Sequence, residues 1–383
     1  MNMFRRIKLV SFALLISTLL IAFNCTYADE HVHQYENHVC TYCSKQESGL
    51  YYEGEYKFSW QELIDRGYIF EEDQGGKRVL LSCSKSLVGD LVVDEGINVI
   101  QGSLWGDAGF TDSMLSTIIL PPTVYKIGYG VFKNAAASQI ILNEGLEIIG
   151  DDVFSGAKNL TSIVMPSTLK EMGGYTFSNC VSLESVTFLG DGLLDSFGEA
   201  TFNRCSNLKH VDIHRFNGIT GNMFYLCTSL ESIDLSDNIT YIWIKAFSGC
   251  SNLKSVKMTD SVVSLGDHCF EGCSSLTEIR MSGSIEKYPN HSYLFTKCDK
   301  LETVYIGKGT MHLTSHLFDG CNIKNLYIPL SVTNIECLFD DCNPYGPPTP
   351  EINVFFEGDE FDWTIINKEE CFSNATMNYN VEY

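Results

Sequence analysis

The sequence has few positive charges. Among its 383 residues, 26 lysines and arginines stand against 48 aspartates and glutamates, which gives a formal net charge of −22 at pH 7. Such a chain repels the phosphates of nucleic acids and the headgroups of anionic lipids. The composition therefore argues against nucleic acid and anionic membranes as direct partners. It suits a soluble extracellular protein, or one whose partner carries a basic surface.

Catalytic motifs are also missing. The chain has no G-x-S-x-G, H-E-x-x-H, P-loop or G-x-G-x-x-G pattern in a suitable context, and these are the local signatures of many hydrolases and nucleotide-binding enzymes. Cys205, His210 and Asp212 lie close in sequence, but the strand periodicity places the cysteine inside and the other two outside. We therefore expect a protein that is not an enzyme.

Long apolar runs are confined to the N-terminus. Arg5 and Arg6 precede an apolar run from Leu9 to Phe23, and Ala28 ends a plausible cleavage site. This order of features predicts a secretory signal peptide over residues 1–28. An uncleaved membrane anchor is the alternative, although a spanning helix needs about 20 apolar residues. No later segment is apolar enough to span a bilayer, so we expect the mature chain to be secreted or displayed at the cell surface.

One pattern recurs through most of the chain. It reads L-x-x-I-x-L, then a polar turn, an apolar pair and F-x-x-C. Its first apolar position recurs at spacings of 22 to 25 residues. A strand of three or four residues cannot bury enough surface alone, whereas copies stacked about 5 Å apart form a parallel ladder over a continuous core. The repeat therefore predicts a solenoid whose successive coils begin at Leu115, Ala137, Leu160, Leu183, Leu208, Leu230, Leu253, Leu276, Leu301 and Ile323.

Two residue types recur in the second half of each copy, on the returning arm that leads the chain back to the next strand. Stacking predicts a buried column of phenylalanines, at Phe132, Phe154, Phe177, Phe202, Phe224, Phe247, Phe270, Phe295, Phe318 and Phe339. Eight of the 15 cysteines share one repeat position: Cys180, Cys205, Cys227, Cys250, Cys273, Cys298, Cys321 and Cys342. We favour a column of small buried thiols here. Disulfides between coils or a chain of metal ions are the alternatives.

The copies resemble the BspA-like subclass of leucine-rich repeats. Segments 246–253 and 253–258 carry the resemblance, as do the aromatic closing segment 353–363 and the last strand within 374–380. The resemblance implies a β-rich leucine-rich-repeat solenoid. Such a solenoid is a right-handed superhelix with parallel short strands on its concave face and mostly irregular or single-turn returns on its convex face. It also implies a surface or secreted protein that binds host components or other cells.

The repeats do not occupy the whole chain. A stretch rich in histidine and cysteine follows the signal peptide, and a proline-rich stretch follows the last repeat. We therefore predict a signal peptide (1–28), a His/Cys-rich leader (29–46), an N-terminal capping region (47–87), the repeats (88–342), and a Pro-rich loop with a C-terminal cap (343–383).

The leader contains a candidate metal site. His31, His33, Cys40 and Cys43 offer two imidazoles and two thiolates, which is a ligand set for tetrahedral Zn²⁺. A single C-x-x-C pair is a weak signal, and a disulfide or a flexible leader without metal are the alternatives. Four protein ligands leave no open position for catalysis, so zinc at this place would be structural.

The binding surface is expected on the strand side of the solenoid. The third and fifth residues of L-x-x-I-x-L point outward, and the candidates among them are His210, Asp212, Asp234, Lys257, Glu278, Arg280, Tyr305 and Tyr327. Tyrosine and arginine are frequent binding hot spots, so the last four form the richest zone. We predict a monomer that binds an extracellular or cell-surface protein through this face. A structural surface component that assembles with itself is the alternative.

Overall fold

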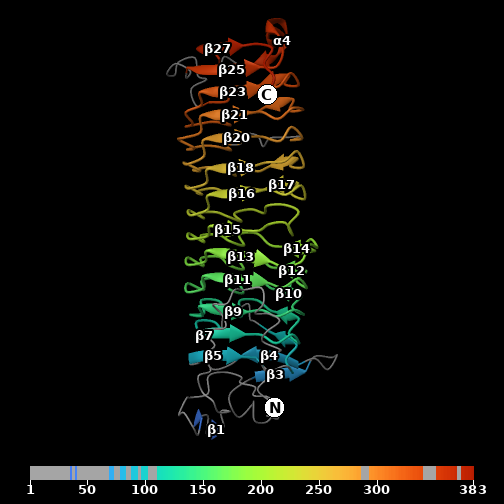
Figure 1. Ribbon diagram of the computed structural model, residues 1–383, viewed down its shortest axis with the longest axis vertical. Helices are drawn as coiled ribbons and strands as arrows, with labels where there is room; N and C mark the ends of the chain where they lie inside the picture. Colours follow the sequence, from blue (N-terminus) through green and yellow to red (C-terminus); the bar gives the residue numbers. More distant parts are fainter. Residues whose placement is uncertain are drawn as a thin grey trace, which may run out of the picture.

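The predicted solenoid is confirmed in the computed structural model. It describes residues 35–36, 39–40, 69–72, 78–82, 88–93, 96–101, 110–285, 293–339, 351–368 and 372–383. From residue 88 onward the described chain forms a column of stacked coils, with the first coils at one end and the last at the other (Figure 1).

One side of the column is built from the short strands of the repeat. Most of these strands pair in parallel with the strand of the next coil at equivalent positions, as Ser232 does with Ser255 and Asp234 with Lys257. They form three consecutive sheets, here termed together the first ladder. Its strands are β5 (Val88–Val92), β7 (Met114–Ile119), β9 (Gln139–Ile141), β11 (Ser162–Met165), β13 (Ser185–Phe188), β15 (His210–Val211), β16 (Ser232–Asp234), β18 (Ser255–Lys257), β20 (Glu278–Arg280), β21 (Thr303–Tyr305), β23 (Asn325–Ile328), β25 (Ile352–Phe356) and β27 (Ala375–Asn378).

A second ladder runs through the returns, which the resemblance describes as mostly irregular or single-turn. In most coils the apolar pair of the repeat is extended and pairs with its copy in the next coil, as Ile149 does with Met172. Stacking in one register brings the backbone groups of these segments together, so they satisfy one another. The strands are β4 (Arg78–Ser82), β6 (Val99–Ile100), β8 (Lys126–Ile127), β10 (Ile148–Ile149), β12 (Glu171–Met172), β14 (Ser196–Phe197), β17 (Tyr241–Ile242), β19 (Ser264–Leu265), β22 (His312–Leu313), β24 (Asn334–Ile335) and β26 (Asn367–Lys368).

The N-terminal strands differ from the coils in direction. Strand β3 (Ile69–Glu72) is antiparallel to β4, and β4 continues in parallel to β6, so this hairpin opens the second ladder. Farther toward the N-terminus, β1 (Tyr35–Glu36) and β2 (Val39–Cys40) form a separate antiparallel pair.

The predicted phenylalanine column is confirmed. The ring centroids of Phe224 and Phe247 are 5.2 Å apart with nearly parallel planes. The same stacking continues from Phe110 to Phe318 at 5.2 to 5.9 Å, and Phe339 extends the column with its ring tilted at 6.1 Å from Phe318. The backbone of this arm also links the coils, since the Phe224 N–H donates to the carbonyl of Ala246 at 2.8 Å. The returning arm is therefore as regular as the strands, although it is built of turns.

The thiol column is confirmed for its members from Cys180 to Cys321, which are free cysteines. Each thiol donates to the carbonyl of the phenylalanine one coil earlier, as Cys250 Sγ does to Phe224 O at 3.1 Å. Burial raises the pKa of the Cys227 and Cys250 thiols, so they stay protonated. Cys342 lies outside the described residues. Cys337, which is not in this column, is disulfide-bonded.

A buried arginine holds the longer coil in place. The coil that begins at Leu183 has 25 residues, and its extra length lies near Gly192. Arg215 is 3% exposed and its guanidinium donates to four carbonyl oxygens, those of Pro166, Leu169, Leu189 and Gly192, at 2.5 to 3.2 Å. Burial lowers the pKa of this guanidinium from its very high usual value. These bonds link carbonyls of two successive coils. The Pro166 carbonyl also accepts from the Leu169 N–H, while those of Leu169, Leu189 and Gly192 are satisfied by the guanidinium.

The C-terminal end of the column carries the one helix of the described residues. Helix α4 (Glu360–Ile365) begins with a capping box. The backbone N–H of Asp362 donates to the Asp359 carboxylate, and the backbone N–H of Asp359 donates to the Asp362 carboxylate. Its Trp363 is buried and packs edge-on against Phe356 at 5.2 Å. After the helix, β27 pairs in parallel with β25, so the last strand expected within 374–380 is confirmed.

Candidate interaction surface

The outward face of the first ladder presents two columns of side chains near its C-terminal end. Register pairing aligns Arg280, Tyr305, Tyr327 and Phe355, and these four are termed the aromatic row. It also aligns Glu278, Thr303, Asn325 and Asn353, which are termed the polar column. Alternate residues of a strand point to the same face, so the two columns run side by side.

The aromatic row is a continuous stack. The guanidinium carbon of Arg280 lies 3.7 Å from the ring centroid of Tyr305. The Tyr305 ring stacks on Tyr327 at 4.4 Å, and Tyr327 stacks on Phe355 at 4.5 Å. Cation–π and offset-stacked contacts of this kind fix the side chains in place. The inner ring faces are covered by their neighbours, so the row offers ring edges and hydroxyls to a partner.

Two neighbouring groups buttress the row. The Tyr383 ring lies 5.3 Å from Tyr327, and its hydroxyl donates to the carbonyl of Ile306 at 3.1 Å. Beside it, Lys308 pairs with Glu357 at 2.9 Å. The Leu330 backbone N–H and the Lys308 ammonium lower the pKa of Glu357, so this carboxylate is ionised at neutral pH.

The surroundings of Tyr305 keep its hydroxyl protonated. Burial, and then the carboxylate of Glu278, raise the pKa of Tyr305. Glu278 also lies 3.6 Å from the Nε of Arg280. The tyrosine can therefore donate a hydrogen bond across an interface at neutral pH.

The polar column adds amide and hydroxyl groups beside the rings. Asn353 Nδ2 donates to Asn325 Oδ1 at 3.2 Å, and Asn325 Nδ2 donates to Thr303 Oγ1 at 3.4 Å. This chain of bonds orients the amides along the column. The face therefore combines fixed aromatic edges with fixed polar groups.

Three more predicted residues meet in a groove on the same side of the column. Asp212, Asp234 and Lys257 line a hollow of about 470 Å³ together with His214, Leu235, Ser236, Asp237 and Thr259. We term it the acidic groove. His214 Nδ1 lies 2.7 Å from Asp212 Oδ1, and its Nε2 lies 2.7 Å from the carbonyl of Gly190. Burial lowers the pKa of His214, but the Gly190 carbonyl and Asp212 outweigh it, and the net pKa is raised.

The predicted candidates therefore fall into two groups and one outlier. Glu278, Arg280, Tyr305 and Tyr327 gather at the aromatic row, while Asp212, Asp234 and Lys257 gather at the acidic groove. His210 is exposed at the start of β15 and lines neither place.

The repeat matches a known family. The model of the BspA type leucine rich repeat region, in six copies, matches residues 105–221 and 217–345, which is more than half of the chain. The chain belongs to the BspA-type leucine-rich repeat family. The resemblance that the repeat sequence suggested is thereby confirmed, and no curated protein matches this BspA-type chain.

Solved structures include other proteins of leucine-rich repeat type. A leucine rich cell surface protein from Faecalibacterium prausnitzii is 20% identical, with 79% of this chain and 96% of that chain covered and a TM-score of 0.38. A leucine-rich repeat protein from Bacteroides ovatus is 16% identical, with 86% and 100% covered and a TM-score of 0.41. The pneumococcal vaccine antigen PcpA is 15% identical, with 82% and 96% covered and a TM-score of 0.39.

The described part of this BspA-type chain shows no metal centre. None of its groups of three or more histidine, cysteine, aspartate or glutamate side chains is arranged to hold an ion. The predicted ligands His31, His33, Cys40 and Cys43 have no described side chains, so that zinc site stays a prediction. Among the described helices, none has the length and apolar character that a membrane crossing requires.

Sequence reasoning missed part of the surface. Phe355 occupies the fifth position of the closing strand, and continuing the register past Tyr327 would have included it. His214 and Asp237 line the acidic groove but lie outside the strand pattern. Tyr383 reaches the row from a segment that follows the last strand, and no local pattern indicates this contact.

Proposed function

We propose that this protein is exported and binds an extracellular or cell-surface protein through the aromatic row. The observation that carries the proposal is the fixed stack of Arg280, Tyr305, Tyr327 and Phe355 on an exposed sheet face. Arginine and tyrosine dominate the energetics of protein interfaces. Their stacking restricts their rotamers before binding, so less entropy is lost when a partner docks.

The acidic groove supports a partner with a basic surface. Asp212, Asp234 and Asp237 line it against Lys257 and His214, and the whole chain is strongly acidic. Complementary charge speeds encounter and fixes orientation more than it adds affinity. We therefore assign to the acidic groove the attraction and orientation of the partner. We assign to the aromatic row most of the binding free energy.

Export and the monomeric state belong to the same proposal. The basic start and apolar run of residues 1–28 support secretion. Repulsion between chains of charge −22 opposes self-association. The size of the protein in solution, measured over a range of protein concentrations, checks this point. Assembly into a structural surface layer would increase that size without added ligand.

Binding can be tested with the secreted chain and a panel of matrix, plasma and microbial-surface proteins. The variant Tyr327→Ser should raise the dissociation constant for a bound protein about thirtyfold, since loss of a hot-spot side chain costs about 2 kcal/mol of binding free energy. The matched control is Tyr225→Ser, a tyrosine on the returning arm beside Arg204, which should leave affinity unchanged. Equal affinity in both variants, or no binding to any panel member, would contradict the proposal.

We also propose a structural zinc ion in the leader, held by His31, His33, Cys40 and Cys43. The donor set supports it, since four such ligands complete a tetrahedral zinc site. Metal analysis of the purified chain should give about one zinc per molecule, and Cys43→Ser should abolish it. Retention of zinc by that variant would exclude this ligand set.

A further inference from the structure

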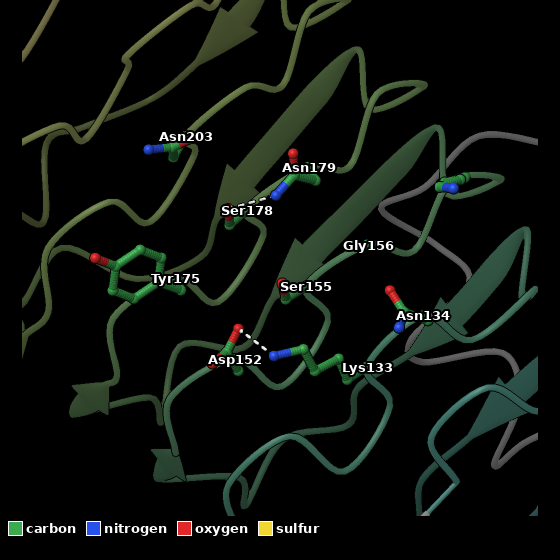
Figure 2. Close-up of a pocket in the computed structure, with 10 residues that line it drawn as sticks. Lys133, Asn134, Asp152, Ser155, Gly156, Tyr175, Ser178, Asn179 and Asn203 are labelled. Atoms are coloured by element: carbon green, nitrogen blue, oxygen red, sulfur yellow. Dashed lines mark hydrogen bonds and ion pairs between the residues drawn. The ribbon is translucent and has the colours of Figure 1, made fainter. Parts of the chain in front are cut away.

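The returning arms of the early coils form a second groove, open to solvent and away from the strand face. It has a volume of about 540 Å³, which is within the usual size range of small-ligand sites. Four consecutive coils line it, through Lys133, Asn134, Asp152, Ser155, Gly156, Lys158, Tyr175, Ser178, Asn179 and Asn203. Figure 2 shows Lys133 and Asn134 on one side of it, with Tyr175 and Asn203 on the other. We term this hollow the return-arm groove.

Small residues follow two of the buried phenylalanines beside the groove. Ser155 and Gly156 follow Phe154, and Ser178 follows Phe177. Asn134 lies close against Gly156, so a larger side chain at position 156 would collide with it. The small side chains therefore leave room between the coils at this place.

Several polar groups in the groove have no partner within the described residues. The side-chain amides of Asn134 and Asn203 and the ammonium of Lys158 make no hydrogen bond or ion pair there, although all three line the hollow. Lys133 and Asp152, by contrast, pair with each other at 3.2 Å. The groove therefore offers two donor–acceptor amides and one uncommitted cation to a ligand.

An exposed aromatic ring completes the groove. Tyr175 is 40% exposed and stacks on no other aromatic ring of the described chain. Its hydroxyl donates to Glu199 Oε1 at 3.4 Å, which orients the ring at the rim. An open ring face beside amides suits a ligand that has both an apolar C–H face and hydroxyl groups.

One cation that lines the groove is free to meet a ligand. Lys133 is paired with Asp152, whereas Lys158 has no ion pair within the described residues. The Lys158 ammonium can therefore attract an anionic group. The lining is mostly hydroxyl, amide and charged, which disfavours an apolar ligand.

We propose that the return-arm groove binds a saccharide unit that carries a carboxylate. The apolar face of the sugar ring packs on Tyr175, and its hydroxyls exchange hydrogen bonds with Asn134 and Asn203. The carboxylate pairs with Lys158. This site is independent of the protein-binding face, because it lies on the returning arms and shares no residue with the aromatic row.

The first test is titration calorimetry of the full chain with glucuronic acid, N-acetylneuraminic acid, glucose and inorganic phosphate as separate probes. At least one acidic sugar should bind saturably, glucose should bind several-fold more weakly, and phosphate should show no saturable binding. Absence of saturable binding by both acidic sugars would overturn the proposal. Phosphate binding as tight as that of the sugars would also overturn it, since it would show a simple anion site.

Variants then locate the site. Tyr175→Asn should weaken the acidic sugar about tenfold, and asparagine tolerates the left-handed backbone of this position, where φ is 55°. Lys158→Gln should weaken the acidic sugar but not glucose, while the control Lys209→Gln, an exposed lysine paired with Glu184, should change neither. Unchanged sugar affinity in both groove variants would refute the assignment. Tyr327→Ser should leave sugar binding intact, so failure here and failure of the protein-binding proposal can be told apart.

Discussion

The interior of the column and its strand face follow opposite rules. Inside, the phenylalanine column repeats one residue in coil after coil, and the thiol column does the same. On the strand face, the fifth position of the repeat changes from Val164 through Asp234 and Lys257 to Tyr305 and Tyr327. An inward side chain must fit identical neighbours on both sides, whereas an outward one meets solvent. The difference teaches that the interior specifies the fold, while the strand face is free to specify a partner.

The largest expected effect comes from interrupting the interior. Phe224→Ala removes a fully buried ring that stacks on Phe202 and Phe247. The loss should lower the free energy of unfolding by about 3–5 kcal/mol, through lost transfer energy and a cavity that the rigid stack cannot close. Chemical denaturation of the variant and the parent measures this. A loss under 1 kcal/mol would show that the column is less tightly packed than its geometry indicates.

The second-largest loss of stability is expected at Arg215, a charged residue that is buried in the column. Arg215→Met keeps much of the side-chain volume but removes the donor to four carbonyls. The Pro166 carbonyl keeps its bond from the Leu169 N–H, and the other three lose the guanidinium donor. We expect the free energy of unfolding to fall by about 2–4 kcal/mol, because a carbonyl that is shielded from water and left without a donor costs desolvation energy. Denaturation again measures it, with Lys209→Met as the exposed control. Equal free energies of unfolding for the two variants would show that the buried hydrogen bonds of Arg215 add no stability beyond that of an exposed lysine.

Substitutions on the strand face should cost less stability. Tyr305→Ser removes two stacking contacts on an exposed sheet, and cross-strand pairs of this kind contribute about 0.2–1 kcal/mol each. The melting temperature should therefore fall far less than in Phe224→Ala, even though protein binding is expected to weaken. A loss of stability as large as that of Phe224→Ala would show that the strand face contributes as much to folding as the interior does.

The smallest effect concerns pH. The folded pKa of His214 is raised, so its contribution to stability is complete below the unfolded value near 6.5 and is lost as pH rises through the folded value. His214→Gln should remove this dependence, which we expect to amount to less than about 1 kcal/mol for a partly exposed pair. Thermal unfolding between pH 6 and pH 8.5 measures it. A parent protein that gains stability over that interval more than His214→Gln does would contradict the sign.

Much of the fold was predictable because one register controls it. Leu230, Leu253 and their counterparts recur at nearly constant spacing, and so do the phenylalanines, so the sequence alone indicates which side chains touch between coils. The second ladder was not predicted, because a strand of two residues such as Ile148-Ile149 is too short to show a periodicity of its own. It becomes visible once the coils are stacked and the backbone groups need partners.

The candidate surface was predictable to a smaller extent. The alternation of each strand placed Arg280, Tyr305 and Tyr327 outward, and their stacking follows from the shared register. Residues outside that alternation could not be placed. Arg215 follows strand β15, and a charged residue at such a place is usually exposed, yet contacts with two coils bury it. Tyr383 approaches the row through contacts between segments 56 and 78 residues apart in sequence.

The hydrogen bonds that pass from coil to coil have a consequence for how such a chain can change its length. Each coil depends on the coil above and the coil below, as Phe224 N–H depends on Ala246 and Cys250 on Phe224. Duplication or deletion of one whole unit of 23 residues between Leu230 and Leu276 would rejoin equivalent surfaces. The distance between the return-arm groove and the aromatic row could thus be adjusted in steps of one strand spacing, about 5 Å, without redesign of the interior.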